Sequence, residues 1–440
     1  MAQVGPFQGI CYNPELIPDM AAVVAPPYDV ICPSEQVQFH ERHPNNVIRL
    51  ILGQPQSGDN EYENAHTRAG RYFTQWMADR VLVKGDCPAF YLTCVTYTAG
   101  GQVHTRFGLI GRVRLEPFEK GIILPHERTF SKVKSERLML MQQCHANFSP
   151  IFGLFTGGME IIEYFQTVAQ RQTPAFDIQD DKGHRHKLWC LTDAETSVLL
   201  TSFFKPKRIF IADGHHRYET ALNYRDWVAA SDPGFNADHP ANFIMMSLSS
   251  MVDPGMTILP AHRLLKDVPA EMLSSFLAQA ETYFDITRFD LANDRTCWLE
   301  DFKRALDQHA HKSAIGLYSR NPSCLHVLVV KAGTMTRLFE SHLPEALRDL
   351  DVTVLTQLIM MEIMGFDQAR LDDATQITYR TTIEEAIAGV DQGEADLAFI
   401  LNPTKIEQVR RVAESGLIMP RKSTYFYPKV ISGQVFHLLR

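Results

Sequence analysis

The chain has 440 residues, of which 45% are apolar and 21% charged, a composition that excludes a fibrous or largely disordered protein. At roughly 100 to 200 residues per domain, this length predicts two or three domains with sizeable cores. The formal net charge of -8 argues against broad, non-specific nucleic-acid binding, which needs a basic surface.

The first informative segment, residues 25–31, reads Ala-Pro-Pro-Tyr-Asp-Val-Ile. Two consecutive prolines exclude a helix and keep the backbone extended, so Tyr28 and Asp29 are expected on an ordered loop. A helix is predicted over 62–79, where apolar residues recur at intervals of three and four. Two β-rich runs, 89–98 and 103–115, flank Ala-Gly-Gly-Gln and predict a hairpin.

The central region predicts a strand, a turn and a helix in direct succession. Residues 135–145 are expected to be helical, and 150–155 to form a buried strand. The apolar run 208–212 predicts a short strand, followed by a turn at Asp213-Gly214 and a helix from His215 onward. Further strands of the same sheet are expected at 242–249 and 256–260.

From about residue 270, predicted helices and strands alternate. The helices are expected at 272–283, 298–308, 352–364, 383–390 and 405–414, and the strands at 313–318, 325–330, 376–379 and 395–401. This pattern predicts an α+β protein with three regions. They are an N-terminal α/β region with a hairpin at 1–120, a core that carries the main polar motifs at 121–265, and a C-terminal α/β region at 266–440.

The eight cysteines are scattered without a C-x-x-C pair, and the N-terminus lacks the continuous apolar stretch of a signal peptide. No window approaches the roughly 18 uninterrupted apolar residues of a membrane span. The sequence therefore predicts a cytoplasmic protein with reduced thiols and no membrane partner.

The strongest chemical signal is Asp213-Gly214-His215-His216-Arg217, directly after a predicted buried strand. A helix N-terminus beside two imidazoles and a guanidinium forms an anion site suited to phosphate. Asp213 can cap the helix or hold a metal ion. The alternative is that Asp213 only caps the helix, while Arg217 forms a surface ion pair.

A second motif, His126-Glu127-Arg128-Thr129, follows an apolar extended segment. Glu127 can act as a general base if the fold brings it within hydrogen-bond reach of a substrate hydroxyl. The alternative is a salt bridge between Glu127 and Arg128 or Arg137.

A third segment offers two cations and two hydroxyl groups, at Arg421, Lys422, Ser423 and Thr424. Pro420 and Pro428 flank it and restrict its backbone, so the segment is suited to bind a phosphate or carboxylate. The alternative, equally open, is an ordinary basic loop.

Other familiar patterns are absent or incomplete. The sequence contains neither a P-loop nor the Rossmann glycine pattern, and no G-x-S-x-G elbow. His184 and His186 form a His-x-His pair, but without suitably spaced partners they are interpreted as ordinary strand or loop residues.

Taken together, the motifs at 25–31, 126–129, 211–221, 399–404 and 419–428 resemble the domain-of-unknown-function family numbered 1015. The resemblance extends from near residue 7 to near residue 438. That family has no settled activity to transfer to this chain.

A more distant resemblance is to the archaeal ADP-dependent free serine kinase family of the ParB/sulfiredoxin-like superfamily. It implies a ParB-like nucleotide-binding core with N-terminal and C-terminal α/β elaborations. It also implies that 395–428 closes over the substrate and that Glu127 is the catalytic base. The resemblance further implies that the turn at Asp213, Gly214, His215, His216 and Arg217 holds the phosphates. Beside it, catalytic roles are expected for His126 and Asp213, with Asp213 also a Mg²⁺ ligand, and nucleotide or phosphate binding is expected for Arg128 and Thr129. Substrate binding is expected for Arg421, Lys422, Ser423 and Thr424, and for Tyr28 and Asp29, whose loop is expected to line the same cleft.

The sequence departs from the kinase family where that family reads Thr-Thr-Arg-His and this chain reads Ser-Thr-Tyr-Phe, so a cation expected to meet the substrate is missing. The function predicted is phosphoryl transfer between ADP or ATP, with Mg²⁺, and a small hydroxy amino acid such as serine. The alternative is a non-catalytic nucleotide or phosphometabolite sensor. The two differ in whether Glu127 accepts a proton.

Overall fold

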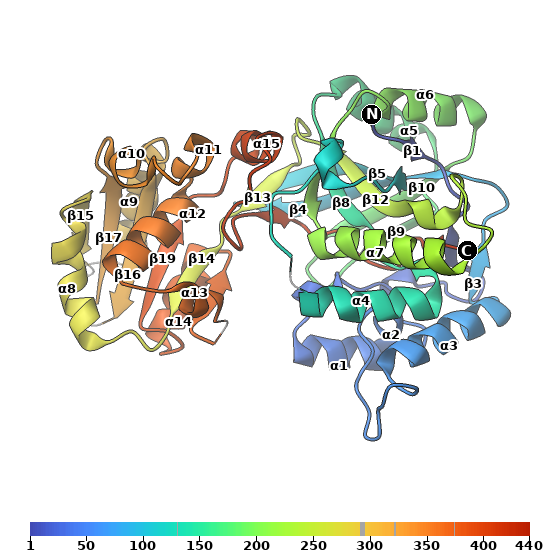
Figure 1. Cartoon of the computed structure of the whole chain (residues 1–440), viewed down its shortest axis with the longest axis horizontal. Helices are drawn as coiled ribbons and strands as arrows, with labels where there is room; N and C mark the ends of the chain where they lie inside the picture. The colour runs from blue at the N-terminus through green and yellow to red at the C-terminus, as the bar shows by residue number, and fades with distance from the viewer. Residues whose placement is uncertain (130, 291–294, 321–322, 374) are drawn as a thin grey trace. The chain divides into compact units, whose positions relative to one another are not determined.

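The protein is described here from a computed structural model, which covers residues 1–129, 131–290, 295–320, 323–373 and 375–440. The chain forms two compact units (Figure 1). Unit 1 comprises Met1–Thr257 and Pro428–Arg440, and unit 2 comprises Ile258–Tyr427. Each unit contains helices, a β-sheet and a hydrophobic core of its own, which confirms the mixed α+β class.

Unit 1 is built on a mixed nine-stranded sheet in the order β6-β11-β8-β12-β5-β4-β10-β9, with β1 paired to β5. Strands β8 and β11 are buried along their whole length, which is expected where both faces of a sheet are covered. The strands of this sheet are β1 (Val4–Gly5), β4 (Phe90–Ala99), β5 (Gln102–Arg114), β6 (Ile123–Leu124), β8 (Ile151–Phe155), β9 (Phe176–Gln179), β10 (Arg185–Leu191), β11 (Ile209–Asp213) and β12 (Phe243–Ser250). Two small sheets pair β2 (Ile10–Tyr12) with β3 (Leu82–Lys84), and β7 (Ala146–Asn147) with β21 (His437–Leu438).

In Figure 1, helices α7, α4 and α3 of unit 1 lie one below another, and α5 and α6 lie at the upper edge of the unit. The helices are α1 (Pro33–Arg42), α2 (Ile48–Ile51), α3 (Ala65–Ala78), α4 (Ser131–Cys144), α5 (Met159–Arg171), α6 (Ala194–Phe204) and α7 (His215–Ser231). Short 3-10 turns are η1 (Met20–Ala22), η2 (Tyr28–Val30), η3 (Phe118–Lys120) and η4 (Pro240–Asn242).

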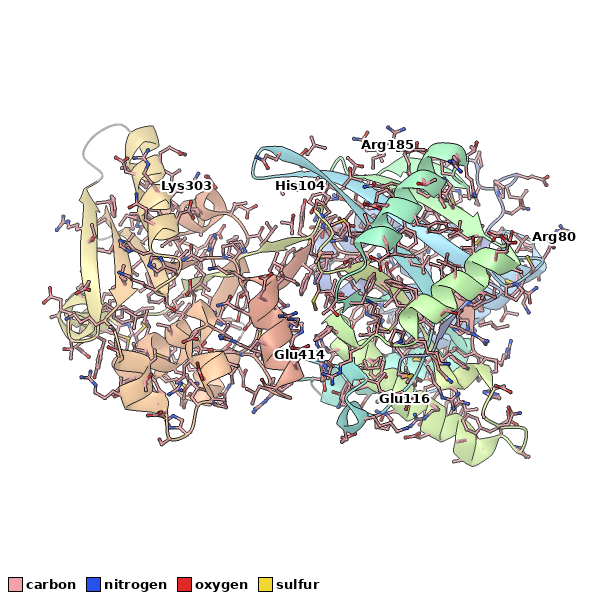
Figure 2. The ribbon with its side chains drawn as sticks, turned by 90° about the horizontal axis from the view of Figure 1, so that it is seen from above. Arg80, His104, Glu116, Arg185, Lys303 and Glu414 are labelled. Carbon is pink, nitrogen blue, oxygen red and sulfur yellow. The ribbon has the colours of Figure 1, made fainter. Side chains whose placement is uncertain are left out.

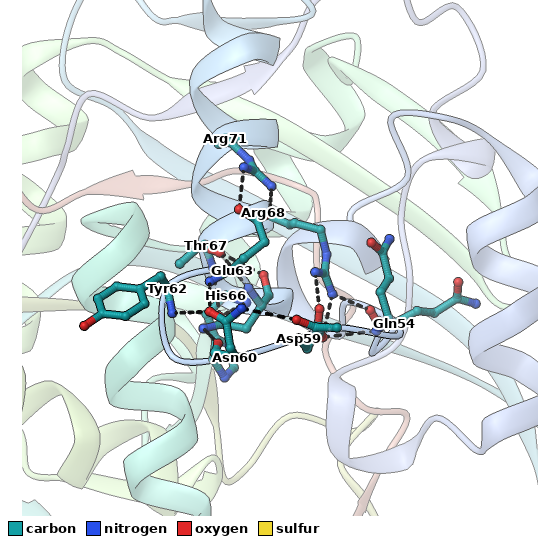
Figure 3. A network of polar contacts seen from close by, with 12 residues as sticks. Gln54, Asp59, Asn60, Tyr62, Glu63, His66, Thr67, Arg68 and Arg71 are labelled. Carbon is teal, nitrogen blue, oxygen red and sulfur yellow. Dashed lines mark hydrogen bonds and ion pairs between the residues drawn. The ribbon is translucent and has the colours of Figure 1, made fainter.

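The N-terminus of α3 shows how local sequence defines a helix boundary. The side-chain oxygen of Asn64 accepts hydrogen bonds from the backbone N–H groups of His66 and Thr67, at 2.9 and 3.2 Å. The loop before it is held by an ion pair between Arg68 and Asp59 (Figure 3). The predicted helix at 62–79 is therefore confirmed, with its start a few residues later.

Unit 2 contains a six-stranded antiparallel sheet in the order β15-β17-β16-β19-β14-β18. Its strands are β14 (His262–Leu265), β15 (Phe284–Asp290), β16 (Ala314–Arg320), β17 (Ser323–Val330), β18 (Ile377–Arg380) and β19 (Leu397–Leu401). Its helices are α8 (Ala270–Ala280), α9 (Arg295–Gln308), α10 (Thr334–Phe339), α11 (Glu345–Arg348), α12 (Asp351–Thr353), α13 (Gln368–Asp372), α14 (Ile383–Asp391) and α15 (Ile406–Glu414), with a π-helix η5 (Val354–Ile363).

One predicted pairing is wrong. The strand expected at 256–260 exists as β13 (Thr257–Leu259), but it pairs with β20 (Tyr425–Tyr427) in a separate two-stranded sheet. Strand β12, which precedes it, already pairs with β5 and β8 on its two sides. No edge of the large sheet is therefore available next to β12.

The two boundaries expected between regions, at 120/121 and 265/266, lie inside unit 1 and inside unit 2, respectively. The first lies inside unit 1, between β5 and β6, which join one sheet. The second lies shortly after unit 2 begins at Ile258. The last residues of the chain return to unit 1, where β21 pairs with β7.

Candidate functional site

The candidate site in unit 1 starts from the junction of β11 and α7. Strand β11 ends at Asp213, Gly214 has φ +95°, and α7 begins at His215. The predicted strand, turn and helix are confirmed. As the N-cap residue, Gly214 brings no side chain to the first turn of α7, so the helix end can face an anion.

Asp213, directly before this turn, is 9% exposed and forms ion pairs with two basic side chains. Its Oδ1 accepts a hydrogen bond from Nζ of Lys429, and its Oδ2 accepts one from Nη2 of Arg217. Arg217 also donates to the backbone carbonyl of Pro150. Asp213, Lys429 and Arg217 by themselves carry a net charge of +1, and the carboxylates of Asp29 and Glu127 bring further negative charge close to Lys429.

The charges in this cluster shift one another's pKa values. Burial opposes ionisation of Asp213, but Lys429 and Arg217 outweigh it and hold the pKa of the carboxyl well below its usual range. Burial also works to lower the pKa of Lys429, but the carboxylates of Asp213, Asp29 and Glu127 raise it above the usual lysine value. Both members of the pair are therefore charged at neutral pH.

Lys429 is the site residue that sequence reasoning missed. It lies 216 residues from Asp213 along the chain and follows Pro428, at the end of the basic segment 419–429. In the sequence, Lys429 is marked only by its position directly after an aromatic run and a proline. Its partner could not be inferred, because the contact depends on the return of the C-terminus to unit 1.

Two histidines form the second part of the site. His126 and His215 are 0% and 3% exposed, and their rings meet edge to face with centroids 4.8 Å apart. Burial lowers the pKa of His126 to about 4 and lowers the pKa of His215 well below its usual value. Both rings are therefore neutral at pH 7.

The tautomer of His215 follows from its contacts. The backbone N–H of His126 donates to Nε2 of His215 at 3.2 Å, so Nε2 must carry a lone pair. The proton of the neutral ring is therefore on Nδ1, and Nδ1 lies 3.7 Å from Oε2 of Glu127. The ring thus presents an N–H toward the half-buried carboxylate, at a distance somewhat longer than a hydrogen bond.

Tyr28 and Asp29 approach the same cluster from η2. The guanidinium carbon of Arg137 lies 4.3 Å from the centroid of the Tyr28 ring, and Tyr28, Arg137 and Arg217 line one cavity of about 50 Å³. Burial raises the pKa of the Tyr28 hydroxyl. Asp29 is exposed, yet close enough to Lys429 to help raise its pKa.

The other predicted site residues differ in their exposure and in the unit to which they belong. His216 and Thr129 are half-buried and Arg128 is exposed. Arg421, Lys422, Ser423 and Thr424 belong to unit 2, where Arg421 pairs with Asp372 at 3.0 Å and the backbone carbonyl of Ser423 accepts from Thr404 at 2.7 Å. Their substrate-binding role stays a prediction.

The predicted Mg²⁺ site at Asp213 does not fit this arrangement. Each carboxylate oxygen of Asp213 already accepts a hydrogen bond from a cation, and Lys429 and Arg217 would repel a divalent ion. Asp213 is therefore the shared counterion of Lys429 and Arg217.

Replacement of Gly214 by alanine tests the turn. A Cβ there would lie 2.9 Å from Nε of Arg217, in a left-handed backbone conformation that costs about 1–2 kcal/mol. We expect a lower urea midpoint and weaker phosphate binding, because Arg217 must move. Gly100→Ala, also at positive φ but with no atom within 4 Å of the added Cβ, is the control. Equal effects from the two variants would contradict this account.

Comparison with known proteins identifies the family. A family model described as a protein of unknown function (DUF1015) matches residues 4–353. The chain belongs to this family. No curated protein matches the chain. No helix among the described residues is long and apolar enough to cross a membrane.

Solved structures resemble the family member described here only weakly. A conserved hypothetical protein from Pyrococcus furiosus is 11% identical, with a TM-score of 0.34 over 73% of this chain and 92% of that one. A free serine kinase in complex with AMP is 12% identical, with a TM-score of 0.34 over 72% and 86%. SbnI with a C-terminal truncation, from Staphylococcus aureus, is 10% identical, with a TM-score of 0.35 over 74% and 86%. These scores support no conclusion about activity.

Proposed function

We propose that unit 1 carries a phosphotransferase site that moves a phosphoryl group between ADP or ATP and a small hydroxy amino acid, serine or phosphoserine. The observation that carries the proposal is the position of Glu127, 3.7 Å from Nδ1 of His215 at the N-terminus of α7. This geometry sets a candidate proton acceptor beside a candidate phosphate site. The choice of nucleotide and serine follows the motif resemblance to the free serine kinase family.

In the proposed reaction, the substrate hydroxyl oxygen forms a bond to the transferred phosphorus while the phosphoanhydride bond of the nucleotide breaks. Glu127 takes the hydroxyl proton, and the N–H on Nδ1 of His215 orients its carboxylate. Arg217, Lys429 and the N–H groups of the first turn of α7 attract and position the phosphate groups. Phosphoryl transfer requires mainly such positioning and charge stabilisation from a protein.

Two finer features belong to the same proposal. One is that unit 1 contains a ParB/sulfiredoxin-like nucleotide-binding core. The other is that the segment 395–428 takes part in substrate binding.

The proposal is tested by titration calorimetry of the full chain with ADP, ATP and phosphoserine, followed by an assay for phosphoserine or serine formation with and without MgCl₂. We expect nucleotide binding and product in at least one direction. Tight binding without product in either direction would favour the alternative function, a nucleotide or phosphometabolite sensor. Absence of binding to all three ligands would contradict both functions.

A further inference from the structure

A second polar cluster lies in unit 1, at the hairpin formed by β9 and β10, and it shares no residue with the candidate site. Oδ2 of Asp180 lies 3.0 Å from Nδ1 of His184 and 2.9 Å from Nε2 of His186. The three atoms lie within 4.8 Å of one another. The histidines are 5% and 4% exposed, so the cluster is largely shielded from water.

The hairpin builds this cluster from a short stretch of sequence. Strand β10 pairs with β9 so that Arg185 faces Gln179, which puts Asp180 opposite His184. Since side chains alternate along a strand, His184 and His186 share one face, and Arg185 points to the other. Arg185 is exposed there (Figure 2). It pairs with Asp177 at 2.7 Å.

The turn also fixes the carboxylate. Gly183 has φ +80°, a conformation that glycine adopts without strain. Oδ1 of Asp180 accepts hydrogen bonds from the backbone N–H groups of Lys182 and His184, both at 2.9 Å. These bonds hold the carboxylate, with Oδ2 directed at both rings.

We propose that Asp180, His184 and His186 form a binding site for a divalent transition metal ion of the zinc class. The ligand atoms are Oδ2, Nδ1 and Nε2, respectively. Zinc binds imidazole nitrogen and carboxylate oxygen at about 2.0–2.2 Å, so two ligands of a tetrahedral ion lie about 3.3 Å apart. The separations from Oδ2, 3.0 and 2.9 Å, are slightly shorter than that value, so the two rings have to shift a little when an ion replaces the shared hydrogen bonds. Three protein ligands leave a position for water.

The charge and protonation of the cluster suit a cation. One carboxylate faces two imidazoles, and each coordinating nitrogen has to be free of a proton when the ion binds. A neutral imidazole meets this condition by carrying its proton on the other ring nitrogen. The sequence pattern pointed away from a metal because the third ligand, Asp180, lies in the turn and gains its position only through the hairpin.

The alternative is that two hydrogen bonds from the rings merely hold the hairpin tip. Metal binding separates the two interpretations. The full chain is incubated with ZnCl₂ or CoCl₂ and desalted, and the bound metal is measured by mass spectrometry, with the visible absorption of Co²⁺ as a second readout. We expect one equivalent per chain, a Co²⁺ spectrum without thiolate charge transfer, and a higher Tm in the presence of Zn²⁺.

His186→Gln and Asp180→Asn are each expected to lose the bound equivalent and the Zn²⁺-dependent rise in Tm. His104→Gln is the matched control, because His104 is a half-buried histidine on β5 of the same sheet and does not belong to the cluster; its ring stacks on Tyr97, with centroids 5.4 Å apart. It should retain one equivalent. Failure of the wild-type chain to bind either ion would overturn the proposal even if a variant fails to fold. Unchanged stoichiometry in both cluster variants would overturn it as well.

Discussion

Glu127→Gln is expected to reduce phosphoryl transfer by about 10²- to 10⁴-fold while leaving nucleotide affinity nearly unchanged. Glutamine keeps the shape of the side chain and can still meet the N–H of His215, but it cannot accept a proton at neutral pH. Nucleotide binding is assigned to the α7 N-terminus, Arg217 and Lys429, which the substitution does not remove. Initial rates of product formation and calorimetric titration with nucleotide measure the two effects separately.

The matched control is Glu219→Gln. Glu219 is also a half-buried glutamate of unit 1, and it pairs with Lys134 at 2.5 Å. Its loss should leave turnover close to that of the unmodified chain. If Glu127→Gln abolishes nucleotide binding together with turnover, Glu127 has a structural role. If turnover is unchanged, another group accepts the proton.

Asp213→Asn should lower the free energy of unfolding of unit 1 by about 3–5 kcal/mol. The carboxylate is the shared partner of Lys429 and Arg217, whose side chains are only 13% and 11% exposed, so its neutralisation leaves two poorly solvated cations without their counterion. Lys429→Met should cost less, since Asp213 keeps Arg217. Urea unfolding followed by tryptophan fluorescence gives the values.

An exposed pair in the same unit provides the comparison. Arg71 in α3 and Glu63, which precedes the helix, form an ion pair (Figure 3). Their side chains are 61% and 49% exposed. Glu63→Gln should leave the urea unfolding midpoint nearly unchanged, because water and salt screen exposed pairs. If Glu63→Gln and Asp213→Asn lower the free energy of unfolding by similar amounts, the Asp213 cluster does not stabilise unit 1 more than an exposed ion pair does.

The Asp213 cluster also predicts a pH dependence of stability. Because the pKa of Asp213 is depressed in the folded state, its stabilisation is complete above the usual aspartate pKa of about 3.9 and is lost as pH falls below that value. Between pH 5 and pH 3, the unmodified chain should therefore lose more stability than Asp213→Asn does. Parallel losses in the two proteins would show that Asp213 titrates normally.

Much of the secondary structure could be predicted from local pattern. The strand at 208–212, the turn at Gly214 and the helix from His215 appear as expected, because burial of the apolar run and the left-handed glycine act within a few residues. The hairpin of β4 and β5 was also predictable, from two β-rich runs around adjacent glycines. The partner of β13 was not, because pairing depends on which sheet edges are open.

The difference between local pattern and long-range contact also applies to the Asp213 cluster and to the cluster of Asp180, His184 and His186. Local sequence indicated which residues could carry chemistry, because a glycine turn with histidines and an arginine directly after a buried strand is suited to bind phosphate. Three contacts became visible only in the folded chain: Lys429 reaches Asp213, His126 fixes the tautomer of His215, and Asp180 joins His184 and His186. The physical reason is that hydrogen bonds and ion pairs act over a few ångströms in space, and chain separation does not reveal which side chains come that close.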